Sequence, residues 1–291
     1  MASPEVSVSF EFFPPGDDAG AAHLWRAVQR LAPLRPRFVS VTYGADGSTR
    51  SRTHECVLRI LAHTDLTVAP HLTCVGAARE EILGIAADYW RHGVRHLVAL
   101  RGDPAAGSCY RPHPQGFAYA SDLVRGLRHT APFEVSVAAY PEGHPESGSP
   151  AADLENLRRK IDAGANRAIT QFFFDTELFL AYRDRCAAAG IRARIVPGIL
   201  PITRFAQMLR FAQRCGASVP PWLCRRFDGL DDDAETRSMI AAHVAIDQVQ
   251  RLRREGVEEF HFYTLNRAEL TYAICHALGI RPAAPAAAEV A

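Results

Sequence analysis

Two carboxylates occupy positions from which they could take part in acid–base chemistry. Glu11 lies within Phe10-Glu11-Phe12-Phe13, and Asp103 follows the apolar run 97–100. Apolar neighbours exclude water, so we expect burial to raise the pKa of Glu11 and to suit it to a general acid. Alternatively, strand alternation turns Glu11 outward to solvent. Asp103 follows Arg101 and should stay ionised, although it could simply form an Asp-Pro turn. The two carboxylates could therefore take separate roles.

A second polar group lies on one predicted helix. Asp153, Asn156, Arg159 and Lys160 are spaced by three or four residues and so share a face. They offer donors and acceptors of the kind that a ribose and a pyrophosphate require. Lys160 is the one lysine among 33 Lys and Arg residues, which indicates a site that needs a compact ammonium. A solvated helix face is the alternative interpretation.

These side chains must be positioned by alternating strands and helices. Apolar runs that end at Gly, Pro or charged residues are typical of buried strands. They predict strands over 6–13, 38–43, 67–74, 97–100, 133–140, 167–174, 193–199 and 259–263. Helical spacing of apolar residues predicts helices over 18–31, 53–62, 79–91, 120–129, 151–163, 178–189, 203–215, 221–227 and 233–255.

Eight strands alternating with helices predict an α/β fold, a (β/α)8 TIM barrel with extra helices before the last strand. An open doubly wound sheet is the rival architecture. No predicted strand is followed by the G-x-G-x-x-G turn that such a sheet often carries. We expect residues 1–281 to form a single catalytic barrel and the Pro- and Ala-rich residues 282–291 to form a flexible tail.

The active site of such a barrel lies at the carboxyl ends of its strands. Most predicted strands end in or near a polar side chain: Glu11, Thr42, His71 with Thr73, Arg101 with Asp103, Tyr140, Gln171, and Tyr263 with Asn266 and Arg267. His144 follows a strand in a Pro-rich loop and could contact a cofactor. Other histidines, such as His92, His96 and His261, are interpreted as structural, and no metal site is predicted.

The composition of the chain limits the classes of partner that we expect it to bind. The chain has 291 residues, 48% of them hydrophobic, which suits a globular protein. A net charge of +1 and the lack of a basic block argue against nucleic acid or an anionic membrane as partner, and favour small molecules. Seven cysteines without a C-x-x-C pair indicate reduced thiols. With no predicted signal peptide or membrane span, we expect a cytoplasmic protein.

Several sequence blocks together carry a family likeness. They include Phe10-Glu11-Phe12-Phe13-Pro14-Pro15, Val41-Thr42-Tyr43-Gly44, His71-Leu72-Thr73-Cys74, Leu100-Arg101-Gly102-Asp103, Ala139-Tyr140-Pro141-Glu142, Thr170-Gln171-Phe172-Phe173, Pro197-Gly198-Ile199-Leu200-Pro201 and His261-Phe262-Tyr263-Thr264-Leu265-Asn266. In this order and combination, the chain resembles the bacterial methylenetetrahydrofolate reductases.

The resemblance implies an FAD-dependent oxidoreductase. Such an enzyme passes a hydride from NADH or NADPH to FAD, and then to 5,10-methylenetetrahydrofolate. The product, 5-methyltetrahydrofolate, feeds methionine synthesis. Because the two substrates use one flavin face in turn, ping-pong kinetics are expected. The family also suggests a homodimer or a homotetramer.

The resemblance further implies roles for individual residues. Glu11 matches the general acid that helps to open the imidazolidine ring of the folate, and Asp103 the carboxylate near flavin and pterin. Gln171 matches a folate-binding residue. Gln207, Phe211, Tyr263 and Arg267 match positions that line the shared folate and nicotinamide site. The FAD-binding positions are Thr42, His71, Arg101, Gly102, Asp103, Tyr119, Ala120, Tyr140, His144, Asp153, Asn156, Arg159 and Lys160. The composition of 105–118 departs from the family pattern.

Two other functions stay open at this point. Another FAD-dependent barrel, such as a proline dehydrogenase, would need a site for an amino-acid carboxylate in place of Gln171 and Glu11. A catalytically silent folate- or flavin-binding protein would not need both Glu11 and Asp103.

Overall fold

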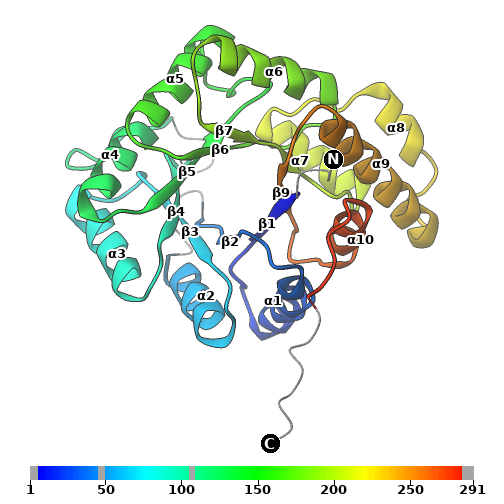
Figure 1. Ribbon diagram of the computed structural model, residues 1–291, viewed down its shortest axis with the longest axis horizontal. Helices are drawn as coiled ribbons and strands as arrows, with labels where there is room; N and C mark the ends of the chain where they lie inside the picture. Colours follow the sequence, from blue (N-terminus) through cyan, green and yellow to red (C-terminus); the bar gives the residue numbers. More distant parts are fainter. Residues whose placement is uncertain (1–5, 45–49, 105–108, 284–291) are drawn as a thin grey trace, which may run out of the picture.

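The computed structural model describes residues 6–44, 50–104 and 109–283. In this part of the chain a parallel sheet of nine strands has the order β7-β6-β5-β4-β3-β2-β1-β9-β8 (Figure 1). The strands are β1 (Ser7–Phe12), β2 (Phe38–Val41), β3 (Val68–Thr73), β4 (His96–Leu100), β5 (Glu134–Ala139), β6 (Arg167–Thr170), β7 (Arg194–Val196), β8 (Gly198–Ile199) and β9 (Glu259–Tyr263). The first strand pairs with both β2 and β9 and so joins the two ends of the fold.

The barrel closes around Pro197. Before this residue β7 pairs with β6, where Ile169 lies opposite Val196, and after it β8 pairs with β9, where Gly198 lies opposite His261. The predicted strand 193–199 is therefore one segment that changes partners. Proline has no N–H to donate, but its carbonyl oxygen accepts a hydrogen bond from the backbone of His261 at 3.0 Å. The predicted TIM barrel is confirmed, and the open doubly wound sheet is wrong.

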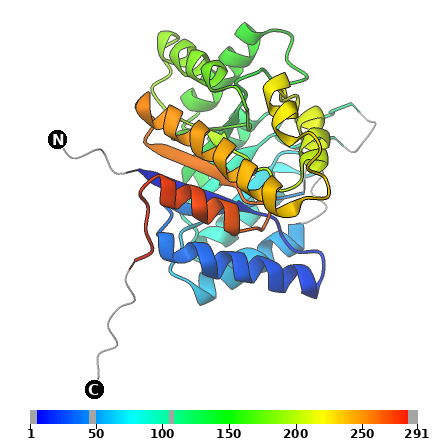
Figure 2. The same ribbon diagram turned by 90° about the vertical axis from the view of Figure 1, so that its right-hand side faces the viewer.

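Helices cover the outside of the barrel (Figure 1). They are α1 (Asp18–Leu31), α2 (Arg50–His63), α3 (Arg79–Arg91), α4 (Ala120–Thr130), α5 (Pro150–Asp162), α6 (Thr176–Ala188), α7 (Phe205–Cys215), α8 (Pro221–Phe227), α9 (Ala234–Arg254) and α10 (Glu269–Ala277), with a short 3-10 helix η1 (Ala32–Leu34). The last helix was not predicted from the sequence. It packs beside α9 (Figure 2), where Ile274 and Cys275 are buried.

Capping residues explain where several helices begin. The side chains of Asp17, Ser149 and Asp175 accept hydrogen bonds from backbone N–H groups in the first turns of α1, α5 and α6. Pro150 at the start of α5 fits because the first helical N–H has no partner within the helix. At the other end of the chain, residues 284–291 of the predicted tail lie outside the described residues.

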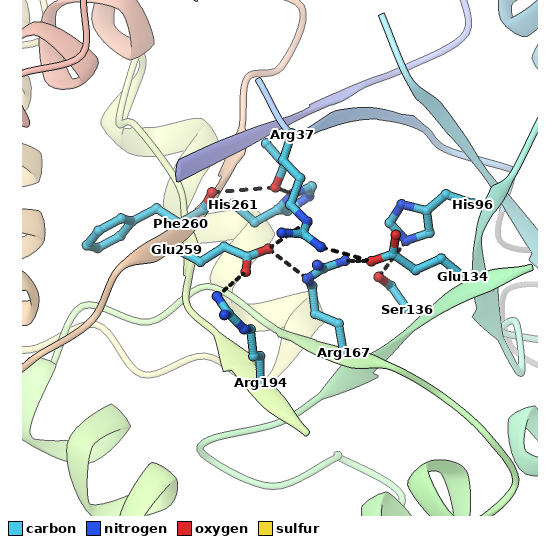
Figure 3. Close-up of polar contacts among 10 residues, drawn as sticks. Arg37, His96, Glu134, Ser136, Arg167, Arg194, Glu259, Phe260 and His261 are labelled. Carbon is cyan, nitrogen blue, oxygen red and sulfur yellow. Dashed lines mark hydrogen bonds and ion pairs between the residues drawn. The ribbon is translucent and has the colours of Figure 1, made fainter. Parts of the chain in front are cut away.

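A buried ion cluster occupies the amino-terminal end of the barrel (Figure 3). Arg167 at the start of β6 lies 2.6 Å from Glu134 at the start of β5 and 2.6 Å from Glu259 at the start of β9. Arg37 and Arg194 approach the two carboxylates from the outside, at 3.4 to 3.9 Å. Because the active sites of such barrels lie at the opposite end, we expect this cluster to serve the stability of the fold.

Candidate active site

A cavity of about 1160 Å³ opens at the carboxyl ends of the strands. Its floor reaches into the barrel, where Val98, Val137 and Ile169 contribute apolar side chains. Its rim is built from the segments that follow the strands, from α5 and from one face of α7. The volume exceeds that of most drug-sized ligand pockets, so the site can hold a large ligand or two ligands together.

The structure brings most of the predicted site residues to this cavity. Its wall contains Glu11, Thr42, His71, Arg101, Gly102, Asp103, Tyr119, Ala120, Tyr140, His144, Asp153, Asn156, Arg159, Lys160, Gln171, Phe211 and Tyr263. Gln207 lies instead in a small adjoining groove of about 10 Å³ that shares Phe211 and Leu265 with the cavity. Arg267 is exposed and lines neither the cavity nor the groove.

Glu11 is buried inside the barrel between two histidines. Its Oε2 lies 3.4 Å from Nε2 of His71 and 3.5 Å from Nε2 of His261. Burial alone would raise the pKa of Glu11, but the hydrogen bonds and charges of the two imidazoles outweigh it and lower that pKa to about 2. The predicted rise in the pKa of Glu11 is therefore wrong. That prediction considered only the neighbouring phenylalanines, whereas the groups that lower the pKa are histidines of β3 and β9. The alternative prediction, that Glu11 points outward to solvent, is wrong as well.

His261 connects Glu11 to a second polar group. Its ring is fully buried, and Nδ1 lies 2.8 Å from the hydroxyl of Ser9 on the neighbouring strand. This histidine was interpreted as structural, and the structure instead places it against Glu11. One signal could have identified it: His261 and Tyr263 are two residues apart on a strand, so both point into the barrel.

The backbone next to Glu11 is held by the segment that follows β9. The Thr264 hydroxyl donates to the carbonyl oxygen of Glu11 at 2.6 Å, and the Asn266 side chain bonds both the N–H and the carbonyl of Phe13 at 2.8 and 3.0 Å. Leu265 and Asn266 adopt left-handed backbone conformations, with φ of 51° and 57°. Such a conformation costs energy in a residue other than glycine, and it places Leu265 on the cavity wall.

Tyr263 is fixed by the closing strands of the barrel. Its hydroxyl donates to the carbonyl oxygen of Thr170 at 2.7 Å, while the Thr170 side chain accepts from the N–H of Gly198 at 2.9 Å. A Cβ on Gly198 would lie 2.2 Å from the Thr170 oxygen and 2.5 Å from the Tyr263 ring, so only glycine fits. Burial, with Glu11 nearby, raises the pKa of Tyr263 well above its ordinary value and keeps the phenol neutral.

Lys160 contributes a buried ammonium to the opposite wall. The Nζ atom donates to the carbonyl oxygen of Ala138 at 2.7 Å and lies 5.9 Å from the Tyr140 ring centre. Burial lowers the pKa of Lys160 to about 8 against the attraction of Asp153, and burial also raises the pKa of Asp153. The side chain is therefore still charged at neutral pH and can attract an anion in a site of low polarity. It does not belong to a solvated helix face.

Arg101 joins three segments of the rim. Its Nη1 lies 2.5 Å from the Glu146 carboxylate, and its guanidinium carbon lies 4.4 Å from the ring centre of Tyr110. Nη2 is buried without a hydrogen-bond partner in the described part of the chain, since the carboxylate of Asp103 is 3.9 Å away. Asp103 itself is exposed. A buried guanidinium N–H without a partner is a donor that a ligand could use.

Residues 6–44, 50–104 and 109–283 contain neither a cluster of metal-binding side chains nor a helix that could span a membrane. Within these ranges, His, Cys, Asp and Glu side chains do not gather in groups of three that could hold a metal ion. In the same ranges, each helix is too short or too polar to cross a membrane.

The closed parallel barrel, with its large cavity at the carboxyl ends of the strands, defines a TIM-barrel protein with a candidate ligand site in the usual place. A family model described as methylenetetrahydrofolate reductase matches residues 1–279, and the chain belongs to this family. The family resemblance of the sequence blocks is thereby confirmed.

Known proteins support this assignment. The 5,10-methylenetetrahydrofolate reductase of Escherichia coli (strain K12) is 56% identical over 278 residues, which cover 96% of this chain and 92% of that protein. Methylenetetrahydrofolate reductase (NADH) 1 of Arabidopsis thaliana is 34% identical, over 95% of this chain and 49% of that protein. Among solved structures, a Clostridium thermocellum protein that binds two copies of 5-methyl-5,6,7,8-tetrahydrofolic acid has a TM-score of 0.66 at 13% identity, covering 96% of both chains. At that identity the likeness supports the fold alone.

Proposed function

We propose that this protein reduces 5,10-methylenetetrahydrofolate to 5-methyltetrahydrofolate with NADH or NADPH, through a bound FAD and in a ping-pong sequence. The single observation that carries the proposal is the 56% identity to the E. coli enzyme over 96% of the chain. We further propose that the protein works in the cytoplasm as a homodimer or homotetramer, and that its product feeds methionine synthesis.

The cavity has properties that suit a flavin dinucleotide. It is large, and its wall offers the buried Lys160 ammonium, the unpartnered Nη2 of Arg101 and the buried Thr73 hydroxyl, which also has no hydrogen-bond partner in the described residues. A diphosphate needs cations and N–H donors, and an isoalloxazine ring needs hydrogen-bonding groups around an apolar slot. These features support the fit of FAD to this site.

The residues proposed to bind FAD fall into groups according to the part of FAD that their side chains suit. Lys160, Arg159 and Arg101 would bind the anionic diphosphate, and Asp153 and Asn156 the hydroxyl groups of the sugar parts. The remaining positions would surround the rings: Thr42, His71, Gly102, Asp103, Tyr119, Ala120, Tyr140 and His144. When bound, FAD would accept a hydride from the nicotinamide and pass it to the folate.

Glu11 would supply the proton that opens the imidazolidine ring of the folate. Its carboxylate is ionised in the ligand-free protein, because its pKa is about 2. We propose that a folate in the cavity displaces water around Glu11 and separates it from the imidazoles, which raises its pKa. Glu11 can then carry a proton and donate it to the amine nitrogen that leaves the bridging methylene carbon.

The other site residues would position the substrates. Asp103 would stabilise cationic folate species near the flavin, and Gln171 would hydrogen-bond the pterin. Phe211 and Tyr263 both line the cavity and would form an aromatic slot for either the folate or the nicotinamide, with Gln207 in the adjoining groove. Arg267 would need to move to reach a ligand in this slot, since it lines neither space in the ligand-free structure.

The experiment is a product assay. The purified protein is incubated with FAD, NADH or NADPH and 5,10-methylenetetrahydrofolate, and 5-methyltetrahydrofolate is measured by mass spectrometry. The proposal predicts product in proportion to the nucleotide oxidised. Folate binding without turnover would favour a silent folate-binding protein, and oxidation of proline with flavin reduction would favour the dehydrogenase; either result contradicts the proposal.

A further inference from the structure

Residues 109–119 lead from the end of β4 towards α4 and contribute Cys109, Tyr110 and Tyr119 to the cavity wall. Most of them belong to 105–118, whose composition departs from the family pattern. Tyr119 is among the proposed FAD-binding residues, whereas Tyr110 has no role in the proposed function. The contacts that Tyr110 makes in this chain indicate one.

The segment that carries Tyr110 is anchored although it is neither helix nor strand. The carbonyl oxygen of Gln115 accepts a hydrogen bond from the N–H of Arg79 at 3.0 Å, and that of Gly116 accepts from Nε of Arg79 at 2.9 Å. A Cβ on Gly116 would lie 2.7 Å from the carbonyl oxygen of Ala77, so the segment lies tightly against the residues before α3. Phe117 is buried as well. A segment fixed in this way can hold a side chain in one position.

The side chain of Tyr110 reaches back to its own segment. Its hydroxyl donates to the carbonyl oxygen of Ala118 at 2.8 Å. Burial raises the pKa of the Tyr110 phenol to about 12, so the ring is neutral at physiological pH. The hydrogen bond fixes the far end of the ring, which therefore keeps one orientation beside the cavity.

The ring of Tyr110 lies over the guanidinium group of Arg101, with 4.4 Å between the ring centre and the guanidinium carbon. At this distance the ring face attracts the positive charge. Nε of Arg101 donates to the carbonyl oxygen of Gly102 at 3.1 Å, and Nη1 donates to the Glu146 carboxylate at 2.5 Å. Nη2 is buried and has no hydrogen-bond partner in the described part of the chain. Three contacts thus hold the guanidinium group and leave Nη2 for a ligand.

The two side chains that touch Arg101 differ in charge. Glu146 is an anion on the cavity wall, so it holds Arg101 and also repels an anionic ligand. The ring of Tyr110 is neutral and holds Arg101 without opposing such a ligand. An arginine that is already ordered loses less conformational entropy when it binds. The effect of the ring on ligand affinity should therefore be favourable and should pass through Arg101.

We propose that Tyr110 is a positioning residue that fixes the guanidinium group of Arg101 and so presents Nη2 to the diphosphate of FAD. This inference rests on the proposed function, since it concerns the same cofactor. The side chain of Arg101 is 19% exposed, so its contact with the ring lies between the exposed and the desolvated cases of a cation–π interaction. Loss of the ring should accordingly weaken FAD binding by about three- to tenfold.

Equilibrium titration of the apoprotein with FAD tests this role in three variants. Tyr110→Leu removes the ring and should show the full loss of affinity. Tyr110→Phe keeps the ring and should stay within about twofold of the wild type. In an Arg101→Ala background, Tyr110→Leu should change the affinity by less than about twofold, because the ring then has no guanidinium group to position.

A matched control uses a second tyrosine with the same kind of contact. Tyr272 on α10 lies outside the cavity wall, and the guanidinium carbon of Arg30 is 3.7 Å from its ring centre. Tyr272→Leu should leave FAD affinity unchanged. Thermal unfolding of each variant shows whether it is folded.

A second measurement needs no FAD. The side-chain Nε–H resonance of Arg101 can be identified in the NMR spectrum by its absence from Arg101→Lys. The ring current of Tyr110 should displace this resonance in the ligand-free protein. The displacement should persist in Tyr110→Phe and disappear in Tyr110→Leu; a resonance that is the same in Tyr110→Leu and the wild type would contradict the positioning role.

Three outcomes of the titrations would also overturn the inference. The first is wild-type FAD affinity in Tyr110→Leu, and the second is an equal loss in Tyr110→Phe, which would assign the effect to the hydroxyl. The third is an equal loss with and without Arg101, since the ring would then contact FAD itself. A protein that binds no FAD would instead contradict the proposed function, and the Arg101 resonance would still decide whether Tyr110 positions this side chain.

Discussion

Glu11 and His261 meet inside the barrel, with carboxylate Oε2 3.5 Å from imidazole Nε2. They come from β1 and β9, the first and last strands, which pair side by side. Together with the contact to His71, this contact explains why a carboxyl group buried among phenylalanines is nevertheless ionised, since its pKa is about 2. Glu11 is thus a carboxylate in the ligand-free protein. The proposed role as general acid therefore requires that its protonation be coupled to binding of the substrate.

Replacement of Glu11 by glutamine should separate the two half-reactions. Glu11→Gln removes the proposed proton donor and leaves the residues proposed to hold FAD in place. We expect reduction of the flavin by NAD(P)H to change less than about threefold, and folate reduction to fall by about 100-fold or more, the scale of general-acid catalysis. Stopped-flow absorbance of each half-reaction measures both.

Glu155→Gln serves as the control for this variant, because Glu155 is an exposed glutamate on α5. It should leave both half-reactions at the wild-type rate. Folate turnover by Glu11→Gln at that same rate would remove Glu11 from the chemistry.

Lys160 should make FAD binding depend on pH. The pKa of Lys160 is about 8 in the ligand-free protein, and an adjacent phosphate would raise it. FAD then binds the protonated form, so its affinity should be constant below pH 8 and fall by up to tenfold per pH unit above it. Equilibrium titration of the apoprotein with FAD from pH 6 to about 9.5 measures this.

Lys160→Gln removes the titrating group. At pH 7 it should weaken FAD binding by roughly 1–3 kcal/mol, the scale of one lost charge-assisted hydrogen bond. The decline above pH 8 should disappear with it. The same decline in wild type and variant would mean that another group titrates, and an unchanged affinity at pH 7 would mean that Lys160 does not contact the diphosphate.

Gly198→Ala should disturb the cavity through Tyr263. The new Cβ would clash with the carbonyl oxygen of Thr170 and with the Tyr263 ring. Overpacking of this kind costs about 1–3 kcal/mol of unfolding free energy, or more because one neighbour is backbone. Urea denaturation measures the loss, and KM for the folate should rise because Tyr263 shifts. Wild-type stability in Gly198→Ala would show that the closing strands are more adaptable than the structure indicates.

The ion cluster at the amino-terminal end should affect stability alone. Arg167→Met leaves Glu259 buried without its closest cation, and breaking a buried pair in this way costs about 3–5 kcal/mol. Adding Glu259→Gln should restore part of that free energy. FAD affinity of the folded single variant should match the wild type, since the cluster and the cavity lie at opposite ends of the barrel. A cost below about 1 kcal/mol would contradict this account.

The sequence predicted the elements that local patterns control. Apolar runs and helical spacing located α3, α8 and β9 at their observed bounds. The predicted strand 167–174 was too long, because Phe172, Phe173 and Phe174 continue its apolar pattern although β6 ends at Thr170. The split at Pro197 depends on which neighbours the segment meets across the barrel, and the local pattern carries no such information.

In the candidate site, too, the sequence predicted what local patterns control and not what depends on distant residues. The helix stripe of α5 was visible in the spacing of Asp153 and Lys160, and both line the cavity. The ionisation of Glu11 was not predictable, because it depends on His71 and His261 from distant strands.

The measurement that tests the central claim most directly is an anaerobic absorbance experiment in two steps. NADH or NADPH is added to the FAD-loaded protein, and 5,10-methylenetetrahydrofolate follows once the nucleotide is consumed. The account predicts that the visible absorption band of the oxidised flavin bleaches with the nucleotide and returns with the folate. A protein that binds no FAD, or whose bleached band does not return with folate, would contradict it.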